Sequence, residues 1–506
     1  VELPTTIGNL TNLQTLSLWS NQLKSLPAAI GNLTGLKVLD LGSNQLSTLP
    51  AQIGNLSGLT VLDLGSNQLS TMPVEIGNLT NLTNLDLHSN QSLTLPAELW
   101  TLTSLEVLGL SEIELGSVPA EIGNLTNLTT LSLGFNQLTE LPAEIGNLTN
   151  LTGLSLQFNQ LSSLPAEIGN LTNLTELGLE VNDFTNLPAE IGSLINLTWL
   201  SVYHNKLTSL PTEIGNLTNL ERLDLWENGL TALPAEIGSL TGLTNLDLAS
   251  NQLASLPLEI WDLVSLERLA LSDNQLTGIP AEIGSLTNLT GLHLANNQLT
   301  GLPVEFWTLT NLQRLSLSDN QLMSLPAQIG NLADLTALYL ANNDLTALPL
   351  EFWTLANLQS LSLSGNQLST IPAAIGNLTH LNRLDMANMQ LSSLPDELWS
   401  LANLQDLDLS GNELVVVPAE IGNLTNLGLL YLANNELTSL PADLWSLTNL
   451  LGLYLSGNQL TAVPNEIVNL VNLQELELDN NPLTGPLPEV LLSLDIAVFT
   501  FADTGW

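Results

Sequence analysis

The sequence predicts an α/β repeat solenoid, a horseshoe or superhelix of stacked units with a parallel sheet on its concave side. A proline recurs every 23 residues from Pro4 to Pro464 without a slip. Around each proline the chain repeats the pattern LxxLxLxxNxLxxLPxxIGNLTN, of which residues 128–150 are a typical copy. A fixed period of this length is the signature of a solenoid whose units contact only their neighbours. The 506 residues therefore indicate one elongated array rather than several domains.

Each repeat is expected to contribute one short strand. Its 21 copies run from the unit starting at Leu13 to the unit starting at Leu473. In the first copy Leu16 and Leu18 alternate with outward positions, which is the period of a half-buried strand. Strands spaced roughly 4.8 Å apart form a ribbon on the order of 100 Å long. Loop or 3-10 segments are expected on the convex side.

An asparagine follows all but two of the predicted strands, from Asn21 to Asn481. Its amide has both donors and an acceptor, so it can satisfy turn backbone groups of its own and the next coil. We therefore predict a buried asparagine ladder, interrupted at Ile113 and Met389. Because Ser92 also takes a core leucine position, repeats four and five are expected to be irregular.

Tryptophan replaces the glycine of the Ile-Gly pair with a longer period of 46 residues. We interpret this as packing that was copied by duplication of a repeat pair, with a functional stripe of outward tryptophans as the alternative. The periodic positions are Trp261, Trp307, Trp353, Trp399 and Trp445, and Trp100 is an isolated instance.

The two ends depart from the repeat. Residues 1–12 form a partial repeat without its strand, so we expect an uncovered hydrophobic end or a preceding segment. We assign 1–494 to the solenoid and 495–506 to a closing strand or cap, because Ile496–Phe501 breaks the pattern. The chain starts within a repeat at Val1, so its lack of a signal peptide or a bilayer-spanning apolar run does not establish a cytoplasmic location.

The charge is strongly one-sided, with 7 Lys and Arg against 49 Asp and Glu and a net charge of −42. This balance disfavours nucleic acid and anionic membranes as partners and favours cations or basic protein surfaces. The chain has no cysteine, so it holds no disulfide framework and no thiolate site.

The repeats containing LPAEIGNLTNL resemble the 23-residue leucine-rich repeats of bacterial proteins and of plant intracellular repeat proteins. The tail LTGPLPEVLLSL, residues 483–494, is similar to the end of receptor-like ectodomains of plants and bacteria. The resemblance implies a curved solenoid that binds protein or glycan on its concave sheet, without implying a particular ligand. The acidic, lysine-poor composition and the tail favour an extracellular or cell-surface location, with the cytoplasm as the alternative. The chain lacks the cysteine-bearing caps of secreted animal and plant members.

Catalysis is disfavoured because the residues that it needs are scattered. The four histidines are several repeats apart, so no two can share a metal ion or a catalytic triad. No glycine-rich phosphate loop with a lysine is present. We expect no enzyme activity. The histidines are His88, His204, His293 and His380.

The leading binding site is expected on the strands of repeats nine and ten. In each strand segment the third, fifth and seventh residues project from the concave sheet and are free to vary. Trp, Tyr and Arg dominate binding hot spots, and Arg222 is placed to stack on Trp199. The alternative is that these solvent-exposed positions vary in sequence without binding a ligand. The predicted site contains Trp199, Tyr203, His204, Arg222, Asp224, Trp226 and Glu227.

A secondary site is predicted further along the same face. Arg268 and Arg314 repeat the column of Arg222, and Arg383 follows, so the four arginines of the chain could serve an acidic ligand group. Tyr431 and Tyr454 lie in register on adjacent strands.

Two acidic features complete the sequence. Asp40, Asp63 and Asp86 share one concave column, where carboxylates could share a Ca²⁺ ion, although solvated aspartates are the alternative. A glutamate follows the proline by two residues in eleven consecutive repeats from Glu75 to Glu305. Such a row repels itself within a Debye length of about 8 Å, so salt or divalent cations are expected to raise the melting temperature.

The sequence therefore predicts a non-enzymatic module that binds a protein or peptide on its concave sheet. Glycan is a further possible ligand, and no cofactor other than Ca²⁺ is indicated. The alternative is an extracellular structural or adhesive protein whose acidic face binds cations. The sequence does not specify the oligomeric state.

Overall fold

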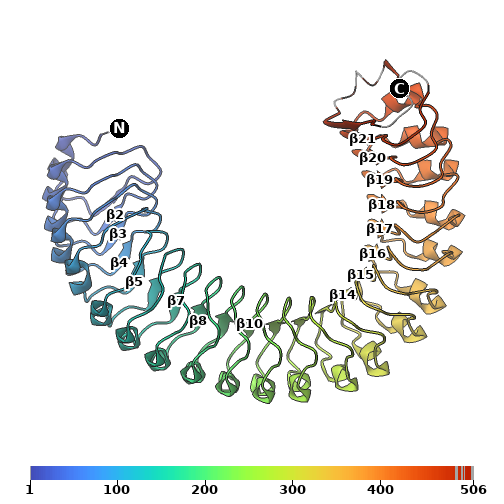
Figure 1. Ribbon diagram of the computed structural model, residues 1–506. Helices are drawn as coiled ribbons and strands as arrows, with labels where there is room; N and C mark the ends of the chain where they lie inside the picture. The colour runs from blue at the N-terminus through green and yellow to red at the C-terminus, as the bar shows by residue number, and fades with distance from the viewer. Residues whose placement is uncertain (1, 485–487, 490, 492–493, 495, 503–506) are drawn as a thin grey trace. The chain divides into compact units, whose positions relative to one another are not determined.

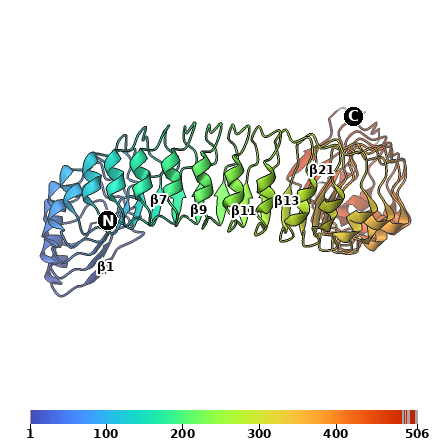
Figure 2. The same ribbon diagram turned by 90° about the horizontal axis from the view of Figure 1, so that it is seen from below.

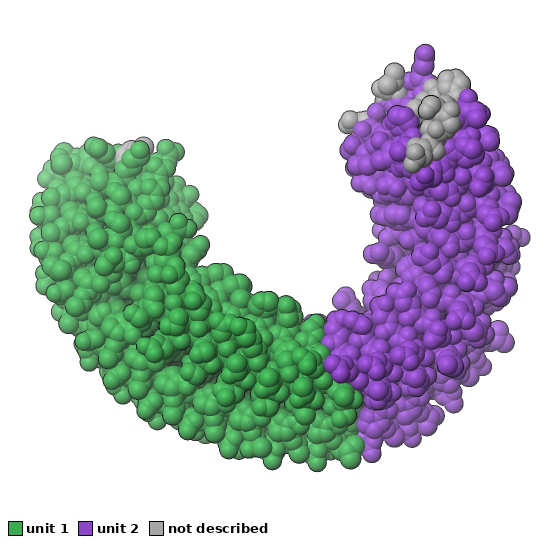
Figure 3. All heavy atoms as spheres, in the orientation of Figure 1, with its two compact units in different colours: residues 1–266 green, residues 267–506 purple. Residues whose placement is uncertain are grey.

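The computed structural model describes residues 2–484, 488, 489, 491, 494 and 496–502. The chain forms two compact units, residues 1–266 and 267–506 (Figure 3). In the described part of each unit, a full repeat contributes one strand of three residues and one 3-10 turn of five residues. In the described part of the chain, no helix is long and apolar enough to cross a membrane.

Unit 1 carries strands β1–β11. Neighbouring strands pair in parallel, with each residue opposite the residue 23 positions later, as Leu200 lies opposite Leu223. The strands are β1 Thr15–Ser17, β2 Val38–Asp40, β3 Val61–Asp63, β4 Asn84–Asp86, β5 Val107–Gly109, β6 Thr130–Ser132, β7 Gly153–Ser155, β8 Glu176–Gly178, β9 Trp199–Ser201, β10 Arg222–Asp224 and β11 Asn245–Asp247. The turns are η1 Thr5–Asn9, η2 Ala28–Asn32, η3 Ala51–Asn55, η4 Val74–Asn78, η5 Ala97–Thr101, η6 Ala120–Asn124, η7 Ala143–Asn147, η8 Ala166–Asn170, η9 Ala189–Ser193, η10 Thr212–Asn216, η11 Ala235–Ser239 and η12 Leu258–Asp262.

Unit 2 repeats this arrangement with strands β12–β22, which also pair in parallel. The strands are β12 Arg268–Ala270, β13 Gly291–His293, β14 Arg314–Ser316, β15 Ala337–Tyr339, β16 Ser360–Ser362, β17 Arg383–Asp385, β18 Asp406–Asp408, β19 Leu429–Tyr431, β20 Gly452–Tyr454, β21 Glu475–Glu477 and β22 Val498–Thr500. The turns are η13 Ala281–Ser285, η14 Val304–Thr308, η15 Ala327–Asn331, η16 Leu350–Thr354, η17 Ala373–Asn377, η18 Asp396–Ser400, η19 Ala419–Asn423, η20 Ala442–Ser446 and η21 Asn465–Asn469.

In each unit the strands lie along the inner side of the coil and the turns along its outer side (Figures 1 and 2). The predicted solenoid of parallel strands and 3-10 segments is therefore confirmed. The third, fifth and seventh residues of each strand segment form the inner surface, which we call the strand face. The leucines between them are fully buried, as Leu200 and Leu223 illustrate.

The proline and glycine of the repeat explain the 3-10 turn. The N–H of Ile30 donates to the Pro27 carbonyl over 3.0 Å, and that of Leu33 donates to the Ile30 carbonyl over 3.1 Å, both three residues back. Proline is tolerated because its position at the start of the turn needs no N–H donor. A Cβ added at Gly31 would lie 2.5 Å from the Gln52 carbonyl oxygen, so close stacking of these turns requires glycine there.

The six tryptophans that replace this glycine are almost completely buried. Their indoles fill space inside the repeat and do not form an outward stripe. The packing interpretation is therefore confirmed for Trp100, Trp261, Trp307, Trp353, Trp399 and Trp445.

The asparagine ladder is also present. Asn44 Nδ2 donates to the carbonyls of Leu18 and Leu41, at 3.0 and 2.9 Å, and its Oδ1 accepts the Leu23 N–H over 3.0 Å. Each rung thus joins two successive coils. Where Ile113 interrupts the ladder, Asn136 Oδ1 accepts the N–H groups of both Ile113 and Leu115.

Repeats four and five are irregular, as predicted. Ser92 and Glu114 have φ angles of 61° and 60°, outside the regular pattern of left-handed residues after each strand. Leu93, displaced by one position, nevertheless reaches the core and is 5% exposed. Left-handed residues at these positions therefore accommodate the displacement of Leu93 by one residue.

At the C-terminal end β22 pairs with β21 within the segment in which a closing strand is expected. Residues 495 and 503–506 of that segment lie outside the described residues, as does Val1 of the partial first repeat. The assignment of 495–506 as a cap stays a prediction.

Candidate functional site

Asp224 is at the centre of the predicted hot spot on β9 and β10. The register places Arg222 opposite Trp199 and Asp224 opposite Ser201. Asp224 Oδ2 accepts hydrogen bonds from Arg222 Nε, over 2.8 Å, and from Trp199 Nε1, over 3.2 Å. Among the described residues Arg222 and Trp199 make no cation–π contact, so the stacking that we expected is replaced by this shared carboxylate. An acceptor between two donors satisfies both and fixes their side chains.

Tyr203 and Trp226 form the apolar part of the same cluster. Their rings stack with centroids 4.7 Å apart and an interplanar angle of 14°. Both are seventh residues of their strand segments, so they stand side by side on the strand face. Stacked rings of this kind present a large, rigid surface with little conformational entropy left to lose on binding.

Charged side chains border this cluster where the strands end. His204 Nδ1 lies 2.9 Å from Glu227 Oε2, and Lys206 Nζ lies 2.6 Å from Asp183 Oδ1. A cavity of about 420 Å³ opens between them, lined by Asn159, Val181, Asn182, Asp183, His204, Asn205, Lys206 and Glu227. The structure thus brings all seven predicted residues into one neighbourhood of repeats eight to ten.

Two carboxyl groups, those of Glu180 and Asp247, lie beside the cluster and were not predicted from the sequence. Glu180 is 9% exposed, and burial raises the pKa of its carboxyl. Burial also raises the pKa of Asp247, on the strand that follows β10. The pKa of the Tyr203 hydroxyl is raised by burial and then by the negative charges of Glu180 and Asp224. Desolvated carboxylates that lie close together make this part of the strand face strongly negative.

A second aromatic pair was also missed. Phe135 and Phe158 stack with centroids 4.2 Å apart, and they are 49% and 40% exposed. Both have left-handed backbones, with φ of 56° and 54°, at a position that is left-handed in every repeat and is most often Ser or Asn. Such a φ is strained for an aromatic residue. Two successive phenylalanines in the eighth column are the sequence signal that identifies them.

The predicted secondary residues all lie in unit 2. Arg268 and Arg314 flank Gly291 on the intervening strand β13. The pKa of His293, on the same strand, is lowered by burial and by the positive charges of Arg314 and Arg268. Within the described residues no ion pair involves Arg268 or Arg314, which leaves two cationic groups beside a histidine that favours its neutral form. Arg383, by contrast, lies 3.4 Å from Asp406.

Tyr431 and Tyr454 stack as expected, with centroids 4.3 Å apart and an angle of 4°. The Tyr454 hydroxyl donates to Glu475, and burial together with this carboxylate raises the pKa of Tyr454. The pair forms a separate aromatic patch of unit 2.

The aspartate column exists, but its carboxylates are turned toward the backbone. The N–H groups of Gly42, Gly65 and His88 donate to Asp40, Asp63 and Asp86 over 3.2, 2.9 and 3.0 Å. Burial raises the pKa of Asp63, with smaller contributions from Asp86 and Asp40. The described residues include no group of three or more His, Cys, Asp and Glu that could hold a metal ion. The arrangement therefore favours solvated, backbone-bonded aspartates over a Ca²⁺ site.

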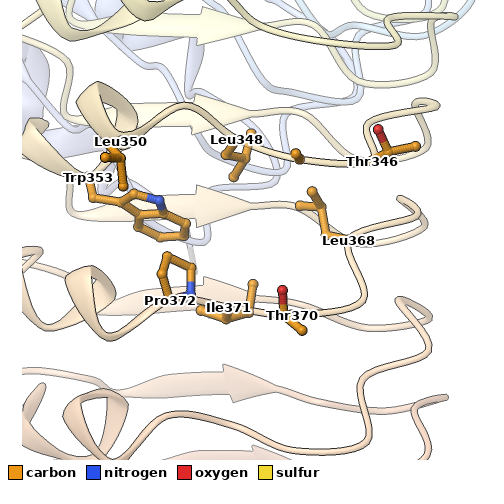
Figure 4. Close-up of a pocket in the computed structure, with 9 residues that line it drawn as sticks. Thr346, Leu348, Leu350, Trp353, Leu368, Thr370, Ile371 and Pro372 are labelled. Atoms are coloured by element: carbon orange, nitrogen blue, oxygen red, sulfur yellow. The ribbon is translucent and has the colours of Figure 1, made fainter.

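A smaller cavity of about 200 Å³ lies in unit 2, away from the predicted residues (Figure 4). It opens between successive repeats, with the indole of Trp353 at one end and Thr346 at the other. Leu348, Leu350 and Pro372 give it an apolar wall, and Thr346 and Thr370 contribute polar groups. None of the predicted site residues lines it.

Comparison with known proteins places these features in context. Profiles described as "Leucine-rich repeat region" match residues 29–115, 97–187, 180–270, 305–410 and 392–485, and one described as "Leucine rich repeat" matches 264–322. No curated protein matches the chain.

Several solved structures are similar to this chain. A leucine-rich repeat protein of Leptospira interrogans is 41% identical, over 78% of this chain and 96% of that one, with a TM-score of 0.66. The plant peptide hormone receptor RGFR1, in complex with RGF2, is 33% identical over 99% of this chain and 92% of that one, with a TM-score of 0.69. The Arabidopsis receptor kinase HAESA, in complex with the peptide hormone IDA and the co-receptor SERK1, is 32% identical over 98% and 88%, with a TM-score of 0.67.

Proposed function

Because the chain belongs to the leucine-rich repeat family, we propose that it is a non-enzymatic interaction module that binds a protein or peptide on the strand face of unit 1. The observation that carries this proposal is the cluster around Asp224. A buried carboxylate holds Arg222 and Trp199, and Tyr203 stacks on Trp226 beside them. Side chains already fixed in place lose little entropy when a ligand binds, and Trp, Tyr and Arg are the residues that contribute most at interfaces.

The similar structures support a peptide as the ligand. RGFR1 and HAESA are described in complex with RGF2 and with the peptide hormone IDA, and the chain aligns with nearly the whole of both. An extended peptide suits a face built from parallel columns of side chains, because it can follow several strands and place successive residues on them. By the same comparison we propose an extracellular or cell-surface location.

Selection of random peptides on the immobilised chain tests this proposal without knowledge of the natural ligand. Peptides enriched on the intact chain are expected to lose binding to the Trp199→Ala, Trp226→Ala double variant. Trp19→Ala is the matched control, since Trp19 is an exposed tryptophan in the same column as Trp226 but on the first repeat, and it is 60% exposed. Equal binding by the intact chain and the double variant would refute the proposal.

An adhesive or structural role is the second candidate, and one observation favours it. The glutamates that follow the proline lie in the first turn of successive 3-10 segments, from Glu75 in η4 to Glu259 in η12 within unit 1. A negative row of this kind attracts cations. This role predicts that loss of Trp199 and Trp226 leaves function unchanged, so the same double variant separates the two candidates.

A further inference from the structure

We propose that Glu180 forms a subsite of the strand face that binds a cationic group of the ligand, either an alkylammonium or a guanidinium. This inference rests on the proposed function and names the chemistry that one part of the site recognises. It concerns repeat eight, which lies between the Phe135–Phe158 pair and the Tyr203–Trp226 pair along the chain.

The subsite is built around a glycine. Gly178 takes the fifth position of its strand segment, where several other repeats carry aspartate. The side chain of Glu180 fills the freed space, since a Cβ added at Gly178 would lie 3.1 Å from Glu180 Oε2 and 3.6 Å from Gln157 Oε1. A carboxylate oxygen and an amide oxygen therefore face the same small volume.

Three buried oxygens lie in this region of the strand face. Glu180 Oε2, Gln157 Oε1 and Ser201 Oγ have no hydrogen-bond partner among the described residues. Ser201 is fully buried. Burial raises the pKa of the Glu180 carboxyl, and the N–H of Glu180 itself and the Ser201 hydroxyl partly offset this effect. A buried acceptor left unpaired is costly, so a ligand that supplies donors here gains more than one that does not.

The nearby cations are already engaged. Arg222 is held by Asp224, and Lys206 is held by Asp183. The negative charge of Asp224 adds to that of Glu180, so no side chain of the cluster neutralises the subsite. An ammonium offers three N–H donors and a guanidinium five, with the positive charge that this volume lacks.

The flanking aromatic pairs suit the stem of such a side chain. Lysine and arginine bury their methylene groups along apolar surface while the charged head reaches a polar partner. Phe135 and Phe158 stack on each other with half-exposed rings, which gives the stem an apolar surface to contact. The ligand is therefore expected to carry a cationic residue next to apolar ones.

The test uses the peptides selected on the immobilised full chain. Enriched sequences are expected to share a lysine or arginine. Replacing that residue by the neutral isostere, citrulline for arginine or norleucine for lysine, is expected to raise Kd for the intact chain about tenfold. With Glu180→Gln the same replacement is expected to change Kd by less than about twofold, because the partner of the cation has been removed. Glu176→Gln, an exposed neutralisation on the same strand, is the control and is expected to preserve the tenfold difference.

The outcomes separate this inference from the proposed function. Enriched peptides without a shared cationic residue would overturn the subsite. So would a neutral replacement that raises Kd equally for the intact chain and for Glu180→Gln. Either result would leave the proposed peptide binding intact. A loss of the tenfold difference in Glu176→Gln as well would show general attraction to an acidic surface and would also overturn the subsite. Failure to enrich any peptide would overturn the proposed function and the subsite together.

Discussion

Trp199 donates its indole N–H to Asp224 on the next strand over 3.2 Å, and the same carboxylate accepts Arg222 Nε over 2.8 Å. Asp224 is 7% exposed, so these bonds form where water competes weakly. The carboxylate thus sets the positions of two side chains that the proposed ligand contacts.

Replacement of Asp224 by alanine tests this role. Trp199 and Arg222 would lose their common acceptor, and we expect the free energy of unfolding to fall by roughly 1–3 kcal/mol, as for other buried partners. Selected peptides are expected to bind more weakly than to the intact chain. Urea unfolding followed by tryptophan fluorescence measures the first effect, with Asp334→Ala, at an exposed aspartate, as the control. An unfolding midpoint equal to that of the intact chain would show that Asp224 does not order the cluster.

Glu180 is expected to destabilise the ligand-free chain. Its Oε2 is buried and has no hydrogen-bond partner among the described residues. Glu180→Gln supplies an amide donor of the same shape, so we predict a higher melting temperature at pH 7. Glu176→Gln should leave it nearly unchanged. A lower melting temperature for Glu180→Gln would mean that the carboxylate has a partner within the fold.

Stability is expected to rise as the pH falls from 7 toward the ordinary carboxyl pKa values of about 4. Burial raises the pKa of five carboxyls above their ordinary values of 3.8 for aspartate and 4.5 for glutamate. The folded chain therefore binds protons more readily than the unfolded chain between these ordinary values and the raised ones, and stability in that window decreases as pH increases. The groups are Asp63, Glu180, Asp247, Asp406 and Asp408.

Protonation of carboxylates also reduces the net charge of −42, and the weaker self-repulsion stabilises the folded chain as the pH falls. Melting curves at intervals between pH 7 and about 4 measure the effect. A steady loss of stability over that range would contradict it, since that is the behaviour of carboxyls with lowered pKa values.

Salt is expected to raise the melting temperature. Glu121, Glu144 and Glu167 occupy equivalent exposed places in η6, η7 and η8, and their mutual repulsion is screened at high ionic strength. The Glu121→Gln, Glu144→Gln, Glu167→Gln variant should respond less to NaCl than the intact chain. Because the aspartate column binds backbone amides, millimolar Ca²⁺ should add little beyond its ionic strength. An unchanged midpoint between dilute buffer and concentrated salt would disprove the repulsion, and a large specific Ca²⁺ shift would restore the calcium hypothesis.

The periodic parts of the molecule could be predicted from sequence because each repeat packs only on its neighbours. The 23-residue period alone places Leu200 opposite Leu223 and Asn44 between two coils. It also places Trp199 beside Arg222, since residues of one column must be adjacent on the strand face. The irregularity at Ser92 was visible as a departure from that period.

The choice of partners within the site could not be predicted in this way. Periodicity gives a side chain its column but not its rotamer. It therefore does not show that Asp224 accepts hydrogen bonds from both Arg222 and Trp199. It does not show either that Glu180 turns back over Gly178. Phe135 and Phe158 were not predicted because the third, fifth and seventh residues of their strand segments include no Trp, Tyr or Arg. His204 and Glu227, in the same eighth column, adjoin Tyr203 and Trp226.

The most direct test of the proposed function is to locate a bound peptide. A selected peptide carrying a photoreactive group is cross-linked to the full chain, and the attached residues are identified by mass spectrometry. We predict attachment to the strand face of repeats six to ten, including Phe158, Tyr203 and Trp226. Attachment confined to the outer 3-10 turns, or to unit 2, would contradict the account.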